Sequence, residues 1–335
     1  MSTSISDNLQ QTSREERVRT ALYRGEALTL ANPVYLRAAR ALAEELLRQD
    51  CETGDRTVEA MGVGARRCIV EIQAKEAGVA AGMEEANWLY ESHGQSATGV
   101  KRDGEFLLPG DILMRIEGDA HSLLALERTA VNLLQRMSGI ATATRRLAAI
   151  ANDASPTAHI VATRKTPWGL LDKRAVHAGG GGTHRLNLGD AILIKTNHLT
   201  LASIGMTEKF DKTLRQAWQW REGAAFFEVE VTSSAEAVAA ARLFAELQAE
   251  ANACPCLLLL DNFSAQDAKS TVRTLHDTGL HDAVIVEASG GVSESSVAAY
   301  AAAGVDAISL GALTHSVRAL DLSAKLISRG EVARP

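Results

Sequence analysis

The sequence has few aromatic residues and no long apolar run. Aromatic residues make up 4% of the 335 residues, against 46% for apolar residues as a whole, so an ample core would be mainly aliphatic. No apolar run approaches the ~20 residues of a membrane span. The first 20 residues, MSTSISDNLQQTSREERVRT, contain no apolar signal region. We therefore expect no membrane segment and a cytoplasmic location.

Cysteine is also scarce, at four residues. Cys254 and Cys256 stand beside the apolar run 257–260, and no second pair with metal-site spacing accompanies them. Buried free thiols are the better interpretation of this pair, and Cys51 and Cys68 stand apart from it. This usage fits a reducing compartment.

Acidic residues outnumber basic ones in the chain as a whole, but one stretch is basic. The net charge is −6, which disfavours nucleic acid and anionic membranes as partners. Residues 163–198 nevertheless hold six Lys or Arg against two acids, so they carry +4 and the rest of the chain carries −10. Basic residues gathered at strand ends favour a small anionic ligand, the alternative being a solvated basic loop. Within this stretch, Gly179–Gly182 does not match a G-x-x-x-x-G-K-[ST] phosphate loop, and no dinucleotide fingerprint occurs.

The first third of the chain predicts a small α+β unit over residues 1–118, with residues 1–14 frayed. Helical spacing of apolar residues predicts helices at 33–49 and 83–91, and alternation predicts strands at 67–75, 98–101 and 111–117. A long helix over 120–151 follows. Arg128, Asn132 and Gln135 share a polar face of it, where Arg128 is either a solvated helix residue or a ligand-binding one.

A strand–helix rhythm then begins. Strands are expected at 159–163, 191–194, 226–231, 256–260, 283–287 and 307–311, with helices at 210–221, 234–250, 265–278 and 294–303 between most of them. This alternation predicts a parallel sheet. Polar residues follow successive strands, as in an α/β barrel. Six clear strands predict an incomplete barrel over 119–316, followed by a C-terminal segment, 317–335, that packs back on the N-terminal domain.

Two carboxylates stand on neighbouring predicted strands, Glu230 and Asp261. They are buried structural acids, a general acid/base pair, or a site for a divalent metal such as Mg²⁺ bound together with phosphate oxygens. Because side-chain direction alternates along a strand, FFEVEV places Glu228 and Glu230 on one side, which we expect to be the barrel interior.

A glycine-rich set follows the last two strands. Ser289-Gly290-Gly291 precedes a helix, and Gly311 is followed by Thr314, His315 and Ser316. Backbone N–H groups at such positions bind phosphate in late barrel strands, the alternative being an ordinary turn. Basic, acidic and glycine-rich sets together suit a phosphorylated sugar with Mg²⁺ and a second, carboxylated substrate.

These motifs resemble those of the quinolinate phosphoribosyltransferase family. The matching segments run in order over most of the chain: GDRT (54–57), LERTAVNLLQRMSGIAT (126–142), TRKT (163–166), GGGGTHRLNLGDAILIKTNH (179–198), EVEV (228–231), LLLDN (258–262), EASGGV (287–292) and GVDAISLGALTHS (304–316). The resemblance implies an N-terminal α/β sandwich domain and a six- or seven-stranded α/β barrel. It also implies a homodimer or higher homo-oligomer in which each sandwich domain covers the partner's barrel and shares its site.

The resemblance implies an activity in NAD biosynthesis: phosphoribosyl transfer from phosphoribosyl pyrophosphate to quinolinate, giving nicotinate mononucleotide, pyrophosphate and CO₂ with Mg²⁺ as cofactor. It assigns catalysis to Lys165, Lys195, Glu230 and Asp261, the two acids also holding the ribose hydroxyls and Mg²⁺. It assigns the binding of the pyridine dicarboxylate and the phosphates to basic residues and one threonine: Thr163, Arg164, Lys165, His184, Arg185 and Lys195. Ser289, Gly290, Gly311 and His315 would bind the sugar phosphate, and Arg128 would reach the neighbouring subunit's site.

The sequence departs from the family pattern at three places. Pro167-Trp168 stands where the family usually has T-P-G, Thr183 where it has Asn, and Thr196 where it has an acid. They leave open a related transferase acting on another pyridine carboxylate. Two other classes also remain: a barrel lyase in which Lys195 forms a Schiff base, and a non-catalytic phosphosugar or pyridine sensor, for which metal-handling carboxylates would be unnecessary.

Overall fold

The computed structural model describes residues 13–62, 66–201, 208–249 and 254–327. The expected frayed segment therefore falls almost entirely outside the described residues. The chain divides into two compact units. One comprises residues 1–24, 146–164 and 181–312, and we call it the barrel unit; the other comprises residues 25–145, 165–180 and 313–335, and we call it the sandwich unit. Within the described residues, no helix is both long and apolar enough to cross a membrane.

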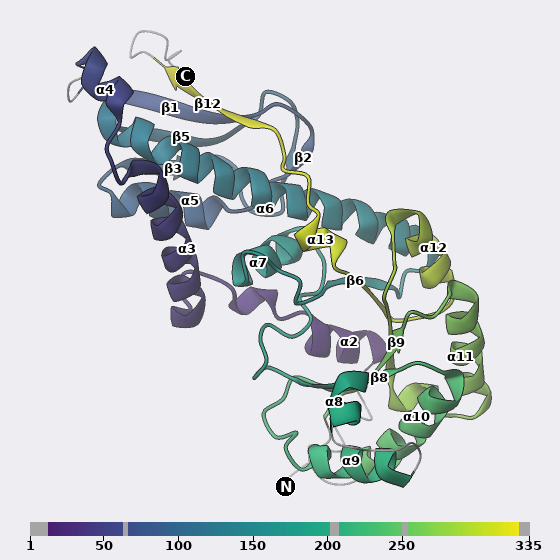
Figure 1. Cartoon of the computed structure of the whole chain (residues 1–335). Coiled ribbons are helices and arrows are strands. Elements are labelled where there is room, and N and C mark those ends of the chain that lie inside the picture. Colours follow the sequence, from purple (N-terminus) through teal and green to yellow (C-terminus); the bar gives the residue numbers. More distant parts are fainter. Residues whose placement is uncertain (1–12, 63–65, 202–207, 250–253, 328–335) are drawn as a thin grey trace, which may run out of the picture. The chain divides into compact units, whose positions relative to one another are not determined.

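A six-stranded parallel sheet forms the centre of the barrel unit, in the order β6-β11-β10-β9-β8-β7. Its strands, visible in part in Figure 1, are β6 (His159–Ala162), β7 (Ile192–Ile194), β8 (Phe227–Val231), β9 (Cys256–Asp261), β10 (Ile285–Ser289) and β11 (Ala307–Leu310). All six predicted strands are confirmed to within two residues at each end. β6 and β7 are the edge strands, so the barrel is incomplete, as the sequence predicted.

Helices connect the strands: α8 (Thr196–Leu201), α9 (Glu208–Trp218), α10 (Ser234–Gln248), α11 (Ala265–Asp277), the short 3₁₀ helix η2 (His281–Ala283) and α12 (Glu294–Ala302). Ser233 and Ser264 cap two of these helices, because each accepts a hydrogen bond from the backbone N–H three residues later. The four predicted helices between strands are confirmed, and α8 is an addition.

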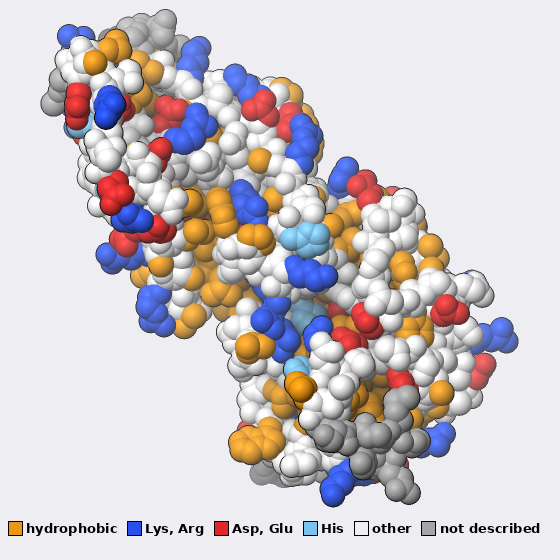
Figure 2. All heavy atoms as spheres, in the orientation of Figure 1, with side chains coloured by type: hydrophobic (Ala, Val, Ile, Leu, Met, Phe, Trp, Pro, Cys, Tyr) orange, Lys and Arg blue, Asp and Glu red, His pale blue; other side chains and the backbone are white. Residues whose placement is uncertain are grey.

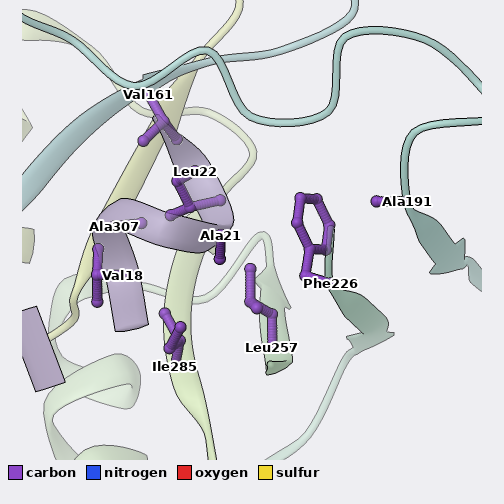
Figure 3. Close-up of a cluster of buried hydrophobic side chains, with 9 residues drawn as sticks. All are labelled: Val18, Ala21, Leu22, Val161, Ala191, Phe226, Leu257, Ile285 and Ala307. Atoms are coloured by element: carbon purple, nitrogen blue, oxygen red, sulfur yellow. The ribbon is translucent and has the colours of Figure 1, made fainter. Parts of the chain in front are cut away.

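Helix α2 (Arg14–Leu22) closes the amino end of the sheet. Val18, Ala21 and Leu22 are fully buried against residues at or near the starts of the strands, including Phe226 and Leu257 (Figure 3). Arg14 fixes this position, since its guanidinium pairs with Asp306 at 2.6 Å. The apolar end is thereby sealed, and the carboxyl ends of the strands remain for polar residues.

The sandwich unit contains a four-stranded antiparallel sheet, ordered β12-β1-β5-β3. Its strands are β1 (Arg67–Ala74), β3 (Ser96–Gly99), β5 (Ile112–Asp119) and β12 (Leu322–Ile327), with a small separate pair of β2 (Gly78–Val79) and β4 (Phe106–Leu107). The C-terminal strand β12 lies along β1, as Figure 1 shows. A strand contributed by the C-terminal segment was not predicted.

The helices associated with this unit are η1 (Gly25–Ala27), α3 (Pro33–Cys51), α4 (Arg56–Met61), α5 (Met83–Ser92), α6 (Ala120–Ala154), α7 (Leu170–Ala178) and α13 (Ala312–His315). Helices α3, α5 and α6 match predicted helices. The first residues of α6 continue directly from β5, and its last turns belong to the barrel unit.

The units do not follow the expected boundaries of 1–118, 119–316 and 317–335. Residues up to Arg24 belong with the barrel because α2 packs on its strand starts. Most of α6 belongs with the sandwich unit, where Gln135 donates to the carbonyl of Leu322 in β12. Local periodicity gave no sign of either long-range contact.

Candidate active site

Polar side chains gather at the carboxyl ends of three neighbouring strands of the barrel unit. Glu230 is the penultimate residue of β8, Asp261 ends β9, and Ser289 ends β10. Asp261 pairs in register with Ser289, and Glu230 pairs with Leu259 two positions before Asp261. Because parallel strands end at the same edge, these groups share one end of the sheet. A crevice of about 310 Å³ opens beside Asp261, with hydroxyl groups among its lining side chains.

Glu230 is held by the residues that follow β7. Its Oε1 accepts hydrogen bonds from the Thr196 backbone N–H at 3.1 Å and from the Thr196 hydroxyl at 2.8 Å, and its Oε2 lies 3.3 Å from the Lys195 ammonium. Partial burial alone would raise the pKa of Glu230, but these bonds and the Lys195 charge lower it overall. Glu230 is therefore an ionised carboxylate of fixed orientation.

The turn after β10 exposes backbone. Gly290 and Gly291 both have positive φ, 85° and 61°. A Cβ on Gly290 would lie 2.3 Å from the Oδ1 of Asn262, so only glycine fits there. The Ser289 hydroxyl accepts from Ser309 of β11 at 2.9 Å, which ties the turn to the last strand. Successive glycines of this kind can direct N–H groups at a phosphate.

His184 lies inside the barrel between two buried glutamates. Its Nε2 is 3.2 Å from Glu228 of β8 and 3.1 Å from Glu287 of β10, and all three side chains are at most 6% exposed. Burial lowers the pKa of His184, but the two carboxylates more than offset this and raise it to about 9. His184 is therefore a buried imidazolium at neutral pH, and burial together with Glu287 raises the pKa of Glu228.

The segment before His184 is threaded along the edge strand β6. Gly182 forms a parallel bridge with Val161, donating to the Ile160 carbonyl at 2.9 Å and accepting from Ala162 at 2.8 Å. His184 has φ 52° and donates its backbone N–H to the Leu22 carbonyl of α2 at 3.0 Å. The glycine run thus serves close packing at the open edge of the sheet.

Two further predicted residues of the barrel unit are basic. Arg185 is buried, and its pKa is lowered by burial and by the neighbouring charge of Arg164. Arg164 is exposed, two residues beyond the end of β6, and Thr163 precedes it half-buried. The structure therefore places these cations near each other in the same unit.

Lys165 falls in the sandwich unit, in a loop with a network of its own. Its carbonyl accepts from the Thr314 hydroxyl at 2.8 Å. Arg136 makes two 2.9 Å hydrogen bonds with Asp172. The Arg136 guanidinium lies 4.9 Å from the centre of the Trp168 ring, and the Trp168 backbone N–H also donates to Asp172. The unusual Trp168 therefore covers a buried ion pair.

Arg128 and His315 also belong to the sandwich unit. The Arg128 side chain is 59% exposed, with the Glu127 carboxylate at 3.8 Å, and the His315 Nδ1 lies 2.6 Å from the Ser316 hydroxyl. Gly311 follows β11 in the barrel unit and is half-buried. The ligand-binding roles assigned to these residues stay predictions.

The residues at the carboxyl end fit a hard divalent cation. Glu230 and Asp261 offer carboxylate oxygens, the donors that Mg²⁺ takes when phosphate oxygens and water complete its shell. Among the described residues, the one group of three close metal-ligand side chains is His184, Glu228 and Glu287. That group is already an ion-paired cluster, so the pair Glu230 and Asp261 remains the better candidate for a metal brought in by a phosphate.

Sequence reasoning missed the partners of two site residues. The alternation in FFEVEV indicated that Glu228 faces inward, but nothing in the sequence paired it with His184 and Glu287. Thr196 and Thr183 are two of the departures from the family pattern that leave the pyridine substrate open. In the structure the Thr196 hydroxyl donates a hydrogen bond to Glu230, and the Thr183 hydroxyl accepts one from the backbone N–H of Arg24.

Comparison with known proteins agrees with this geometry. The model of the quinolinate phosphoribosyl transferase C-terminal domain matches residues 140–325, and that of the N-terminal domain matches residues 55–138. A probable nicotinate-nucleotide pyrophosphorylase (carboxylating) of Methanothermobacter thermautotrophicus is 37% identical over 287 residues, 85% of this chain and 98% of that protein. The human nicotinate-nucleotide pyrophosphorylase (carboxylating) is 34% identical over 310 residues, 92% of this chain and 97% of that protein.

Solved structures agree as well. The nicotinate-nucleotide pyrophosphorylase of Francisella tularensis superposes with a TM-score of 0.74 at 29% identity, over 87% of this chain and 96% of that one. The enzyme of the same name from Ehrlichia chaffeensis gives 0.73 at 26% identity, over 86% and 98%. The two family models together cover most of the chain, and the chain belongs to the quinolinate phosphoribosyltransferase family.

Proposed function

We propose that this protein transfers the phosphoribosyl group of phosphoribosyl pyrophosphate to quinolinate and releases pyrophosphate and CO₂. The product is nicotinate mononucleotide, a precursor of NAD. The observation that carries the proposal is the arrangement at one end of the sheet: Glu230 beside Lys195, with Asp261 next to the Ser289-Gly290 turn. The names of the relatives support the same reaction.

Each set of residues has a distinct task. In the transfer, the ring nitrogen forms a bond to C1 of the ribose while the bond from C1 to pyrophosphate breaks. Positive charge develops on the sugar in between, and the carboxylates of Glu230 and Asp261 stabilise it. The turn at Ser289, Gly290 and Gly291 binds the 5′-phosphate through backbone N–H groups.

The basic residues handle the anionic ends of the substrates. Lys195, Arg164 and Arg185 bind the pyridine carboxylates and the pyrophosphate, with Lys165 and Thr163 beside them in the sequence. Loss of CO₂ from the carboxylate next to the ring nitrogen leaves the electron pair of the broken bond on the ring carbon. That carbon then takes up a proton. Glu230 and Asp261 would hold Mg²⁺ together with the substrate, and the bound cation would supply positive charge for the departing pyrophosphate.

A product assay tests the reaction. The protein is incubated with phosphoribosyl pyrophosphate, Mg²⁺ and a panel of pyridine carboxylates, and nucleotides and CO₂ are measured. We expect nicotinate mononucleotide and CO₂ in equal amounts from quinolinate. If the protein converts nicotinate but not quinolinate, its assignment as a phosphoribosyltransferase would stand, and its assignment as a decarboxylating enzyme would be overturned.

The environment of Lys195 weighs against a Schiff-base lyase. A lysine nucleophile is activated by desolvation or by neighbouring cations. The Lys195 side chain is instead 45% exposed and lies 3.3 Å from a carboxylate, so it is not a desolvated lysine. Borohydride trapping with a keto substrate should therefore leave the protein unmodified.

The proposal includes an oligomer with shared sites, in which Arg128 acts in the partner's site. Its exposed, planar guanidinium suits bidentate binding of a carboxylate or phosphate. Arg128→Ala and Lys195→Ala should each be inactive alone. Reassembled together as mixed dimers, they should recover about a quarter of the wild-type activity, because half the dimers have one intact site. No recovery after verified subunit exchange would place Arg128 in its own subunit's site or outside it.

We also propose that the protein works in the reducing cytoplasm. All four cysteines are free thiols, and burial raises the pKa of Cys254 to about 12, which keeps that sulfur unreactive. Fractionation of cells that produce the protein, with activity followed in each fraction, tests the compartment.

A further inference from the structure

Thr196 occupies a specific place beside the carboxylate that faces the sugar. It is the first residue of α8, directly after Lys195, and β7 runs in register with β8 so that Ile194 pairs with Val229. Lys195 and Thr196, which follow Ile194, therefore lie beside Glu230, which follows Val229. The chain delivers two consecutive residues, a cation and a hydroxyl, to the same side chain.

The two carboxylate oxygens of Glu230 have different partners. Oε1 accepts both Thr196 bonds, from the hydroxyl at 2.8 Å and from the backbone N–H at 3.1 Å. Oε2 faces the Lys195 ammonium at 3.3 Å. A carboxylate held through one oxygen by two donors keeps its plane when the partner of the other oxygen leaves.

Lys195 is the partner that is able to leave. Its side chain is 45% exposed, whereas that of Glu230 is 11% exposed. A partly exposed ion pair contributes little to stability, because water screens it. An incoming pyrophosphate or carboxylate therefore competes for Lys195 at low cost, while Glu230 stays where Thr196 holds it.

The structure around Thr196 keeps its hydroxyl in place. The backbone N–H of Lys195 donates to the His198 Nδ1 at 2.9 Å, and the Thr200 hydroxyl donates to the Thr196 carbonyl at 3.0 Å. These bonds fix the first turn of α8. Threonine is β-branched, so its χ1 is restricted and the hydroxyl loses little freedom on binding Glu230.

We propose that Thr196 is a positioning residue for Glu230: it holds the carboxylate toward the ribose while Lys195 moves to a substrate anion. This inference rests on the proposed function, because it assumes that Glu230 acts on the sugar. It assigns Thr196 to the phosphoribosyl half of the reaction and not to the pyridine half.

The test compares three variants of the full-length protein. Thr196→Val removes the hydroxyl and keeps the shape, Thr196→Ser keeps the hydroxyl, and Thr274→Val removes a hydroxyl that donates within another helix, α11, to the Ser270 carbonyl. We expect Thr196→Val to lower kcat about 10-fold with the KM for quinolinate within about twofold of wild type, as loss of one charge-assisted hydrogen bond suggests. Thr196→Ser should stay within about threefold of the wild-type kcat, and Thr274→Val within about twofold.

A crystal structure of Thr196→Val without metal or substrate gives a second readout that does not involve turnover. We expect the Glu230 carboxylate to rotate toward Lys195 in Thr196→Val and to keep its wild-type orientation in Thr196→Ser. Wild-type kcat in Thr196→Val, an unmoved Glu230, or equal losses in all three variants would overturn the inference. Absence of quinolinate turnover in the wild type would instead count against the proposed function, and the position of Glu230 in the variants would still decide the role of Thr196.

Discussion

The buried His184 cluster predicts a pH dependence of stability that a single substitution should abolish. The perturbation is His184→Asn. Asparagine tolerates the positive φ of 52° better than most residues, so the backbone is preserved while the charge is lost. The variant leaves Glu228 and Glu287, which are 0% and 1% exposed, without the cation between them.

The magnitude follows from the pKa of His184. It rises from 6.5 to about 9 in the folded protein. At about 1.4 kcal/mol per unit, the charged form contributes roughly 3 kcal/mol to the free energy of unfolding. Because the folded pKa is the higher one, this contribution is complete below pH 6.5 and is lost as the pH rises through about 9.

Thermal unfolding from pH 6 to pH 10 is the assay. The wild-type midpoint should exceed that of the variant by roughly 6 to 12 °C at pH 6, taking about 2–4 °C per kcal/mol for a unit of this size. The two curves should converge by pH 9 to 10, apart from any constant packing difference. His121→Asn, which changes an exposed histidine, should follow the wild type. A gap between wild type and His184→Asn that stays constant from pH 6 to pH 10 would refute a charged His184.

The other predictions concern the carboxyl end of the sheet. Glu230→Ala and Asp261→Ala should each lower kcat by ~10²-fold or more if they stabilise charge on the sugar or its metal, and folded variants with near-normal rates would show the acids to be structural. Gly290→Ala should raise the KM for phosphoribosyl pyrophosphate by about 10-fold or more, because a Cβ 2.3 Å from Asn262 Oδ1 must distort the turn, and Gly290→Ala combined with Asn262→Ala should recover part of that affinity. Initial rates at varied substrate concentration, with circular dichroism as the folding control, measure these effects.

The elements that the sequence predicted best are those with a strong local pattern. The alternation of apolar runs and helices located all six strands of the parallel sheet, and the polar residues after them indicated which end carries the site. β12 was missed because LSAKLI is short and mixed in polarity, and only its pairing with β1 makes it a strand. Helix α2 was missed because it is strongly polar, although Ser13 and Glu16 form a capping box that would have predicted its start.

The sequence predicted which kinds of residue lie in the site, but it did not predict which of them interact with one another. Acidic, basic and glycine-rich groups at strand ends could be identified because each follows an apolar run. Ion pairs in the site join side chains from different parts of the chain. His184, for example, lies between Glu228 of β8 and Glu287 of β10. The Thr196 bond to Glu230 is of the same kind, since it joins residues 34 positions apart. Sequence alone offers no signal for such pairings.

The glycine run before His184 shows how a sequence motif can serve packing instead of ligand binding. Gly182 bridges to Val161 of β6, and a Cβ at Gly182 would lie 2.8 Å from Val161 Cγ1 and 3.2 Å from the Leu22 carbonyl oxygen. Gly182→Ala should therefore destabilise the protein by about 1–3 kcal/mol, as overpacking of a core does. In the double variant Gly182→Ala, Val161→Ala the closer clash is gone but the backbone carbonyl remains. Its destabilisation should thus be smaller than the sum of the two single effects, by roughly 0.5–3 kcal/mol in a double-mutant cycle. Strict additivity in chemical denaturation would mean that the chain moves aside at Gly182 and that glycine is not required there by the strand beside it.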